Sequence, residues 1–304
     1  MVNYYGYDDC IRLQNDSVTV TLCPAAGGRV LEYSLDGKNM LYLPPGDEGW
    51  RWTPESRRGP MHAGRFDIGP ERMVQRGPVL WMGRWKGEIT GDRRAKLTSQ
   101  FDPKSGVQLT REFKLAGDSS HLICTQTIHN QSKEPVSLCH WSRTFAVGNG
   151  IAVLPRTKLG RFPFGVVMYT NGFSIDIKPT DPNIVVSDRF VTIKAAPKYP
   201  KLGFDAYSDW MAYLAPNNQM FVKRYRTYRD RPYNEAAGLT ASVWYPANRD
   251  MVELEPIGPA ENLQPDQKGS FTEEWWLLKH DFPTGDANPE AVEGIVKSKT
   301  KTPQ

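Results

Sequence analysis

The sequence lacks the features that mark membrane and exported proteins. None of its apolar runs approaches the roughly 20 residues that a helix needs to cross a bilayer. Its first twenty residues have no basic start followed by an apolar stretch, so we expect no signal peptide. We therefore expect a cytoplasmic location for the chain as given and no membrane partner. A signal segment removed from upstream would instead imply a periplasmic or secreted protein.

Motifs for nucleotide, hydrolase and metal chemistry are also missing. The patterns GxGxxG, GxxxxGK[ST], GxSxG and HExxH do not occur in the chain. Its 5 histidines are scattered, and none of its 4 cysteines belongs to a CxxC pair. We therefore expect neither a cofactor nor a metal site.

The cysteines leave two interpretations open. Cys10 and Cys23 flank one expected hairpin, and Cys124 and Cys139 flank another, so each pair could lie near a cross-strand position. Four buried free thiols would suit a cytosolic chain, whereas two hairpin disulfides would imply export.

Positive charge is concentrated in two segments, although the net charge is only +4. Residues 51–94 and the segment KRYRTYRDR at 223–231 are both strongly basic. Solvated loops explain such clusters simply, but planar Arg side chains also suit a uronate, a sulfated sugar or a sugar phosphate. A nucleic acid partner is not expected, because no RNA- or DNA-binding motif accompanies the modest pI of 8.7.

Frequent Gly and Pro residues and the alternation of polar and apolar residues predict an all-β fold. The chain has 26 Gly and 24 Pro, too many for long helices, and more than a dozen short alternating segments typical of strands. Long irregular stretches interrupt them at 44–78 and 155–185. We predict a large antiparallel β-sandwich in one domain, 1–286, and a short helix with a disordered tail at 287–304. Nine Trp, 13 Tyr and 12 Phe favour an aromatic-lined cleft.

Two segments carry candidate acid–base groups. Strand alternation over 136–147 places His140 on one face and Trp141 and Arg143 on the other. Farther along the chain, Glu253 and Glu255 share one face of a strand. A histidine and a carboxylate are the minimal equipment for general acid–base catalysis. Alternatively, the two glutamates pair with the basic segment 223–231.

Three segments together resemble the galactose mutarotase-like, or aldose 1-epimerase-like, superfamily. They are VTVTLCPAAGGRVLEYSLDGKNMLYL, HNQSKEPVSLCHWSRTF and SVWYPANRDMVELEPIGPAENLQPDQKGSFTEEWWL. The resemblance spans most of residues 17–279 in order and is strongest to the superfamily's uncharacterised bacterial branches. It implies the superfamily's supersandwich fold.

The resemblance also implies roles for individual residues. His140 matches the acid that protonates the ring oxygen, and Glu255 matches the base that takes the anomeric proton. His62, Arg65 and Asp67 resemble a substrate-binding segment. The remaining substrate-binding candidates are aromatic residues for stacking, a second glutamate and arginines of the basic clusters: Trp81, Trp141, Glu253, Arg72, Arg224 and Arg226.

The resulting functional hypothesis is an epimerase-like enzyme that acts on a sugar hemiacetal. The partner would be a small sugar or an oligosaccharide, and the basic clusters favour an anionic one. The alternatives are a non-catalytic carbohydrate-binding protein and a sugar lyase or hydrolase on the same scaffold.

Overall fold

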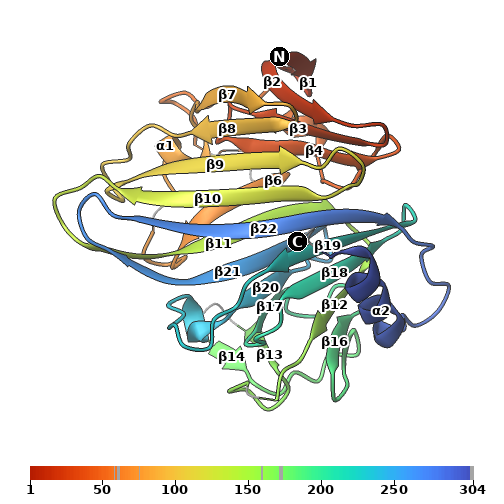
Figure 1. Ribbon diagram of the computed structural model, residues 1–304. Coiled ribbons are helices and arrows are strands. Elements are labelled where there is room, and N and C mark those ends of the chain that lie inside the picture. Colours follow the sequence, from red (N-terminus) through yellow and green to blue (C-terminus); the bar gives the residue numbers. More distant parts are fainter. Residues whose placement is uncertain (58, 60–61, 75, 159, 171–173, 302–304) are drawn as a thin grey trace.

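The chain folds into two antiparallel β-sheets that pack face to face (Figure 1). This computed structural model describes residues 1–57, 59, 62–74, 76–158, 160–170 and 174–301. The predicted all-β sandwich is confirmed. The predicted helix near the C-terminus is also confirmed as α2, Pro289–Lys299. The expected disordered tail includes residues 302–304, which lie outside the described residues.

The first sheet has twelve strands among the described residues, with a short strand, β5, beside β4 at one end. In spatial order it comprises β1 Val2–Tyr4, β2 Tyr7–Gln14, β3 Val18–Cys23, β4 Arg29–Leu35, β6 Gly64–Gly69, β11 Val136–Val147, β21 Met251–Leu263, β20 Ala241–Trp244, β17 Lys201–Phe204, β13 Val166–Thr170 and β14 Ser174–Asp176, with β5 Lys38–Asn39 off this path.

The second sheet has ten strands in the described part of the chain. Their spatial order is β15 Ile184–Val186, β16 Phe190–Ile193, β12 Ile151–Pro155, β18 Trp210–Ala215, β19 Gln219–Tyr225, β22 Lys268–Lys279, β10 Leu122–Asn130, β9 Val107–Leu115, β8 Arg94–Thr98 and β7 Lys86–Gly91. Helix α2 lies against one end of this sheet (Figure 1), where Val292 and Val296 belong to a buried apolar cluster that includes Trp210.

Aromatic side chains fill the space between the sheets. The rings of Phe66 on β6 and Trp275 on β22 stack with centroids 5.5 Å apart. Phe221 on β19 meets Trp275 edge-on, with centroids 5.4 Å apart. Rings of this size bury much apolar area, so part of the aromatic surplus in the sequence forms the core rather than a cleft.

The structure corrects several sequence predictions. The irregular stretch 44–78 contains β6, a central and fully buried strand, and 155–185 contains β13 and β14 and begins β15. A single helical turn, α1 Pro78–Trp81, precedes β7. Strands β6, β13 and β14 escaped prediction because they are short and lie in stretches rich in Pro and Gly.

The four cysteines are free and buried. The β2–β3 register pairs Ile11 with Leu22, so Cys10 and Cys23 lie opposite each other as expected. Cys124 and Cys139 do not, because β10 and β11 belong to different sheets.

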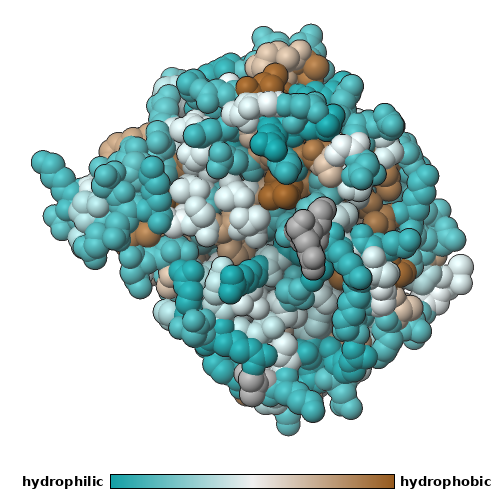
Figure 2. Space-filling model, viewed as in Figure 1, coloured by the Kyte–Doolittle hydropathy of each residue, from teal (hydrophilic) through white to brown (hydrophobic). Residues whose placement is uncertain are grey.

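The surface visible in Figure 2 is mostly hydrophilic, with small scattered apolar patches. Among the described residues, no helix is both long and apolar enough to span a membrane.

Candidate functional site

A row of polar side chains covers the outward face of the first sheet at its centre. On β11, Ser142 and Thr144 point toward the second sheet, where both bind Lys223 Nζ, at 2.9 and 3.0 Å. Alternation therefore turns Trp141 and Arg143 outward. On the neighbouring strand β21, Glu253 and Glu255 share this outward face.

Glu255 is a buried carboxylate held by two donors. Lys201 Nζ on β17 lies 2.7 Å from Oε1 and 2.6 Å from Oε2, and Trp141 Nε1 donates to Oε2 at 2.7 Å. Burial raises the pKa of Glu255 to about 7 although Lys201 opposes the shift, and nearby Glu253 raises it further. A carboxylate with a pKa near neutrality is suited to accept and return a proton.

Arg143 is fixed beside this carboxylate. Its Nε donates to Glu253 Oε1 at 2.5 Å and its Nη2 to Glu253 Oε2 at 3.1 Å. The guanidinium carbon lies 4.5 Å from the centroid of the Trp141 ring. Burial would lower the pKa of Arg143, but Glu253, Glu255 and Asp67 raise it, so the side chain stays charged. Asp67 on β6 in turn forms a hydrogen bond with Arg65.

Of these residues, Trp141, Arg143 and Lys201 line a cavity of about 440 Å³, a volume typical of small-molecule sites. Its wall includes three aromatic rings, whose apolar faces can pack against a sugar ring. It also includes hydrogen-bonding and charged groups that can bind hydroxyls. The lining residues are Glu71, Arg72, Arg76, Trp141, Arg143, Tyr169, Lys201, Glu235, Ala236, Ser242 and Trp244.

Tyr169 supplies a hydroxyl to this wall. Burial raises the pKa of Tyr169 above its usual value, and the carboxylates of Glu235, Glu255 and Glu71 raise it further. The phenol therefore stays protonated at neutral pH and remains a hydrogen-bond donor.

His140 does not join this group. Its ring points between the sheets, where Nδ1 lies 3.3 Å from Gln126 Nε2 and Nε2 lies 3.2 Å from the Gly269 carbonyl oxygen. The ring stacks on Phe271, and burial lowers the pKa of His140 to about 3. His140 and Glu255 thus lie on opposite faces of the first sheet, and the structure does not bring the expected acid–base pair together.

Five of the other predicted residues lie in or beside the cavity wall. Arg72 and Trp141 line the cavity, while Glu253, Asp67 and Arg65 lie in the polar row beside Arg143.

His62 lies at the edge of this row rather than in the cavity wall. Its ring contacts Phe145 on β11, and its Nδ1 lies 2.5 Å from Asp47 Oδ2.

Three predicted residues lie elsewhere. Trp81 is buried in the core at α1. Arg224 binds Asp209 and the Thr300 carbonyl oxygen, and Arg226 is exposed with its guanidinium over Tyr228. No residue of the basic segment 223–231 lines this cavity. The ion-pair partners of Glu253 and Glu255 are Arg143 and Lys201, which lie outside that segment.

Sequence reasoning missed several cavity residues: Lys201, Tyr169, Glu235, Trp244, Glu71 and Arg76. Alternation on β11 did place Arg143 beside Trp141, and that was the one available signal. Lys201 begins a four-residue strand that follows Pro200 and contains Gly203, and no sequence pattern distinguishes it from a loop.

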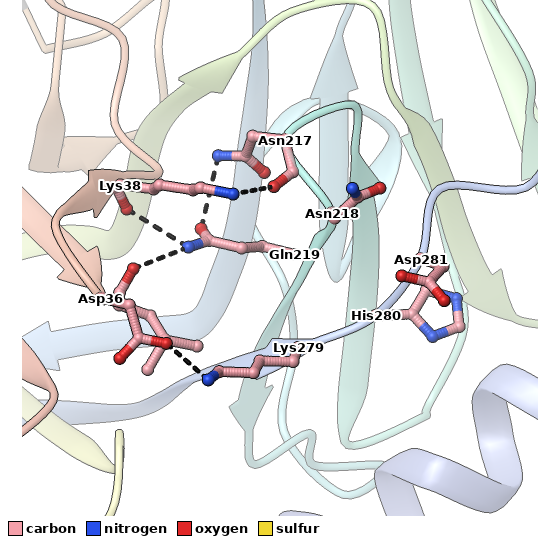
Figure 3. Close-up of a pocket in the computed structure, with 9 residues that line it drawn as sticks. Asp36, Lys38, Asn217, Asn218, Gln219, Lys279, His280 and Asp281 are labelled. Atoms are coloured by element: carbon pink, nitrogen blue, oxygen red, sulfur yellow. Dashed lines mark hydrogen bonds and ion pairs between the residues drawn. The ribbon is translucent and has the colours of Figure 1, made fainter.

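A second cavity, of about 410 Å³, lies where the turns after β4 and β18 approach the end of β22 (Figure 3). Its polar groups largely satisfy one another. Lys279 Nζ pairs with Asp36 at 2.7 Å, and Gln219 Nε2 donates to the Leu35 carbonyl oxygen at 3.1 Å. It has no buried carboxylate comparable with Glu255, so we take the first cavity as the functional site.

Comparison with known proteins identifies the fold. No protein-family model matches the chain, and no curated protein matches its sequence. Among solved structures, Slr1438 from Synechocystis sp. PCC 6803 superimposes with a TM-score of 0.61 at 14% identity, covering 92% of this chain and 99% of the other. A galactose mutarotase-like protein from Lactobacillus casei has a TM-score of 0.60 at 10% identity, covering 89% and 100%. Another galactose mutarotase-like protein, from Clostridium acetobutylicum, has a TM-score of 0.60 at 12% identity, covering 91% of this chain and 97% of the other.

Proposed function

We propose that this chain, which has the galactose mutarotase-like fold, is an epimerase-like enzyme that acts on the hemiacetal of a sugar bound in the 440 Å³ cavity. The observation that carries the proposal is Glu255, a fully buried carboxylate with a pKa near 7, held by two residues of the cavity wall. Its position on β21 is the one that the family resemblance assigns to the base.

The reaction requires proton transfer at two oxygens. Opening a pyranose removes the proton from the anomeric hydroxyl while the ring oxygen gains one, and closing on the other face of the carbonyl gives the other anomer. Glu255 would accept the anomeric proton. Because Lys201 lines the cavity and Glu255 does not, we take the anomeric oxygen to replace one of the two short hydrogen bonds from Lys201.

The proton donor must come from the cavity rather than from His140. Tyr169 is our candidate, since its phenol lines the cavity and stays protonated. Lys201, which lines the cavity beside the carboxylate, would stabilise negative charge that develops on the anomeric oxygen.

The test is anomer interconversion of aldoses, followed by NMR exchange with Glu255→Gln. We expect the wild-type protein to accelerate anomer exchange. In the variant, the catalysed rate should fall at least about a hundredfold, the usual contribution of a general base. Glu261→Gln, on the same strand but paired with Arg231 outside the cavity, is the matched control and should retain wild-type rates. Equal rates in wild type and Glu255→Gln would reject the assignment.

A non-catalytic carbohydrate-binding protein is the second candidate. The favouring observation is that both Glu255 oxygens already accept hydrogen bonds from within the protein. In addition, a TPR-domain containing protein from Parabacteroides distasonis includes this fold as 49% of its chain, with a TM-score of 0.59 at 17% identity. Saturable sugar binding without accelerated exchange would support this candidate. Cleaved products from oligosaccharides would instead indicate a lyase or hydrolase.

A further inference from the structure

One donor on the cavity wall has no acceptor. Arg143 uses Nε and Nη2 to hold Glu253, but its Nη1 is buried and has no hydrogen-bond partner among the described residues. Asp67 Oδ2 lies 3.7 Å and Glu71 Oε1 lies 3.8 Å from Nη1, which is too long for a hydrogen bond in either case. The whole residue is only 5% exposed.

This geometry is that of a prearranged donor. The bidentate contact with Glu253 and the stacking on Trp141 fix the guanidinium plane, so Nη1 cannot rotate toward another acceptor. A buried donor without a partner is costly, and native proteins rarely retain one without a reason. Here the donor belongs to a residue that lines the cavity, where a ligand can supply the acceptor.

We propose that Arg143, together with Asp67 and Glu71, determines specificity by binding one uncharged hydroxyl of the ligand. The hydroxyl oxygen accepts a hydrogen bond from Arg143 Nη1, and its proton is donated to the Glu71 carboxylate, since both oxygens of Asp67 already accept hydrogen bonds from Arg65. The assignment rests on the proposed function, because it takes the ligand to be a sugar in the same cavity.

The surrounding charges favour a neutral group over an anion. An anionic oxygen placed at Nη1 would lie close to both Asp67 and Glu71, whereas a hydroxyl can use its proton to satisfy a carboxylate. Positive and negative charges are also equal in number over the wider site. The cations Arg65, Arg72, Arg76, Arg143 and Lys201 are matched by the carboxylates Asp67, Glu71, Glu235, Glu253 and Glu255. The anionic ligand favoured by the basic clusters in the sequence thus loses its main support at this position.

Glu71 also provides access to the donor. Its side chain is 43% exposed and follows β6 in the segment that forms part of the cavity wall. The backbone N–H of Glu71 is fixed by Glu235 Oε2 at 2.8 Å, while its side-chain Oε1 accepts a hydrogen bond from Arg76 Nη2 at 2.9 Å, an ion pair open to solvent. We take exchange of this exposed ion pair for contacts with the ligand to open Nη1, because exposed ion pairs are weak.

The test asks whether the effect of removing one ligand hydroxyl depends on the Glu71 carboxylate. We would measure affinities by calorimetry or ligand-observed NMR for neutral aldohexoses, their monodeoxy analogues and the matching uronic acids. For the wild-type protein, we expect one of the monodeoxy analogues to bind about tenfold or more weakly than its parent sugar, the range for a hydrogen bond to a charged group. In Glu71→Gln that loss should shrink to within about threefold, whereas the exposed control Glu134→Gln should retain the full loss.

Arg143→Lys gives a second measurement, since it keeps the charge but loses the third donor; Glu71→Gln decides the matter if Arg143→Lys does not fold. Two results would overturn the assignment while leaving the proposed function intact. The first is that sugars bind but Glu71→Gln does not reduce the affinity lost on removal of any single hydroxyl. The second is that uronic acids bind at least tenfold more tightly than neutral hexoses. Failure of all the sugars to bind would reject the proposed function as well.

Discussion

His140 shows how burial decides the role of a single residue. Its imidazole touches Gln126, Gly269 and Phe271 between the sheets and has no route to the cavity on the other face of β11. Because burial lowers the pKa of His140 to about 3, the ring is neutral at physiological pH and cannot serve as an imidazolium acid there. We therefore expect His140 to stabilise the fold rather than to transfer protons.

Replacement of His140 by Ala should separate these two roles. Loss of the buried ring should lower the free energy of unfolding by about 2–4 kcal/mol, as for other large-to-small changes in a core. Anomer exchange per folded molecule should change less than about threefold. Urea denaturation monitored by tryptophan fluorescence measures the first, and NMR exchange measures the second. A folded variant without activity would restore the catalytic assignment.

The pH dependence of stability provides an internal check on the same variant. His140 has a folded-state pKa of about 3, below the ordinary value of 6.5, so the unfolded chain binds a proton first as the pH falls. Its stabilising contribution is therefore complete above pH 6.5 and is lost progressively toward pH 3, at about 1.4 kcal/mol per pH unit. His140→Ala should show a correspondingly smaller loss of stability on acidification than wild type.

Among the elements, the short strand β17 contributes a critical residue to the site. It pairs with β20 so that Lys201 lies opposite Trp244, and its ammonium reaches across to Glu255 on β21. Lys201 lowers the pKa of Glu255 against the larger effect of burial. The identity of residue 201 therefore sets the pH at which the proposed base becomes ionised.

Replacement of Lys201 by Met should move that pH upward. A carboxylate accepts protons only when ionised, so kcat/KM for anomer exchange should rise with pH through an apparent pKa of about 7 in wild type. Without the lysine, the ascending limb should shift to higher pH by at least one unit, on the order of the coupling expected for a close charge pair. The exposed Lys198→Met serves as the control. An unshifted limb in Lys201→Met would show that Glu255 is not the titrating group.

The sequence predicted some elements well and others poorly, for physical reasons. Hairpins with alternating apolar residues and a polar turn were identifiable, as at Asn15 between β2 and β3. Strand β6 was not, because its alternation of Arg65 and Asp67 with apolar residues lasts only a few positions inside a stretch rich in Pro, Gly and Arg. Half of the expected catalytic pair, Glu255, lies beside the cavity, and alternation alone placed His140 on the face opposite Trp141. What no pattern indicated was which face of the sheet would carry the cavity.

At the scale of the whole molecule, a buried lysine links the two sheets. Lys223 on β19 forms an ion pair with Glu273 on β22 at 2.9 Å. It also donates to Ser142 and Thr144 of β11 and, at 3.2 Å, to the Leu254 carbonyl oxygen of β21. Burial lowers the pKa of Lys223, while Glu273 opposes the shift. This one ammonium thus contacts the inner faces of the two strands whose outer faces present Arg143 and Glu255.

Loss of this link should be costly unless both charges are removed. Lys223→Met leaves the Glu273 carboxylate buried without its cation, and we expect the free energy of unfolding to fall by about 3–5 kcal/mol. The double variant Lys223→Met/Glu273→Gln removes both charges and should recover most of that loss, because an uncharged buried pair avoids the desolvation penalty. Chemical denaturation of the single and double variants measures the difference. Lys279→Met, which removes an exposed ion pair with Asp36, should cost no more than about 1 kcal/mol. If the double variant were as unstable as Lys223→Met, the hydrogen bonds to β11 and β21, rather than the ion pair, would be what holds the sheets in register behind the cavity.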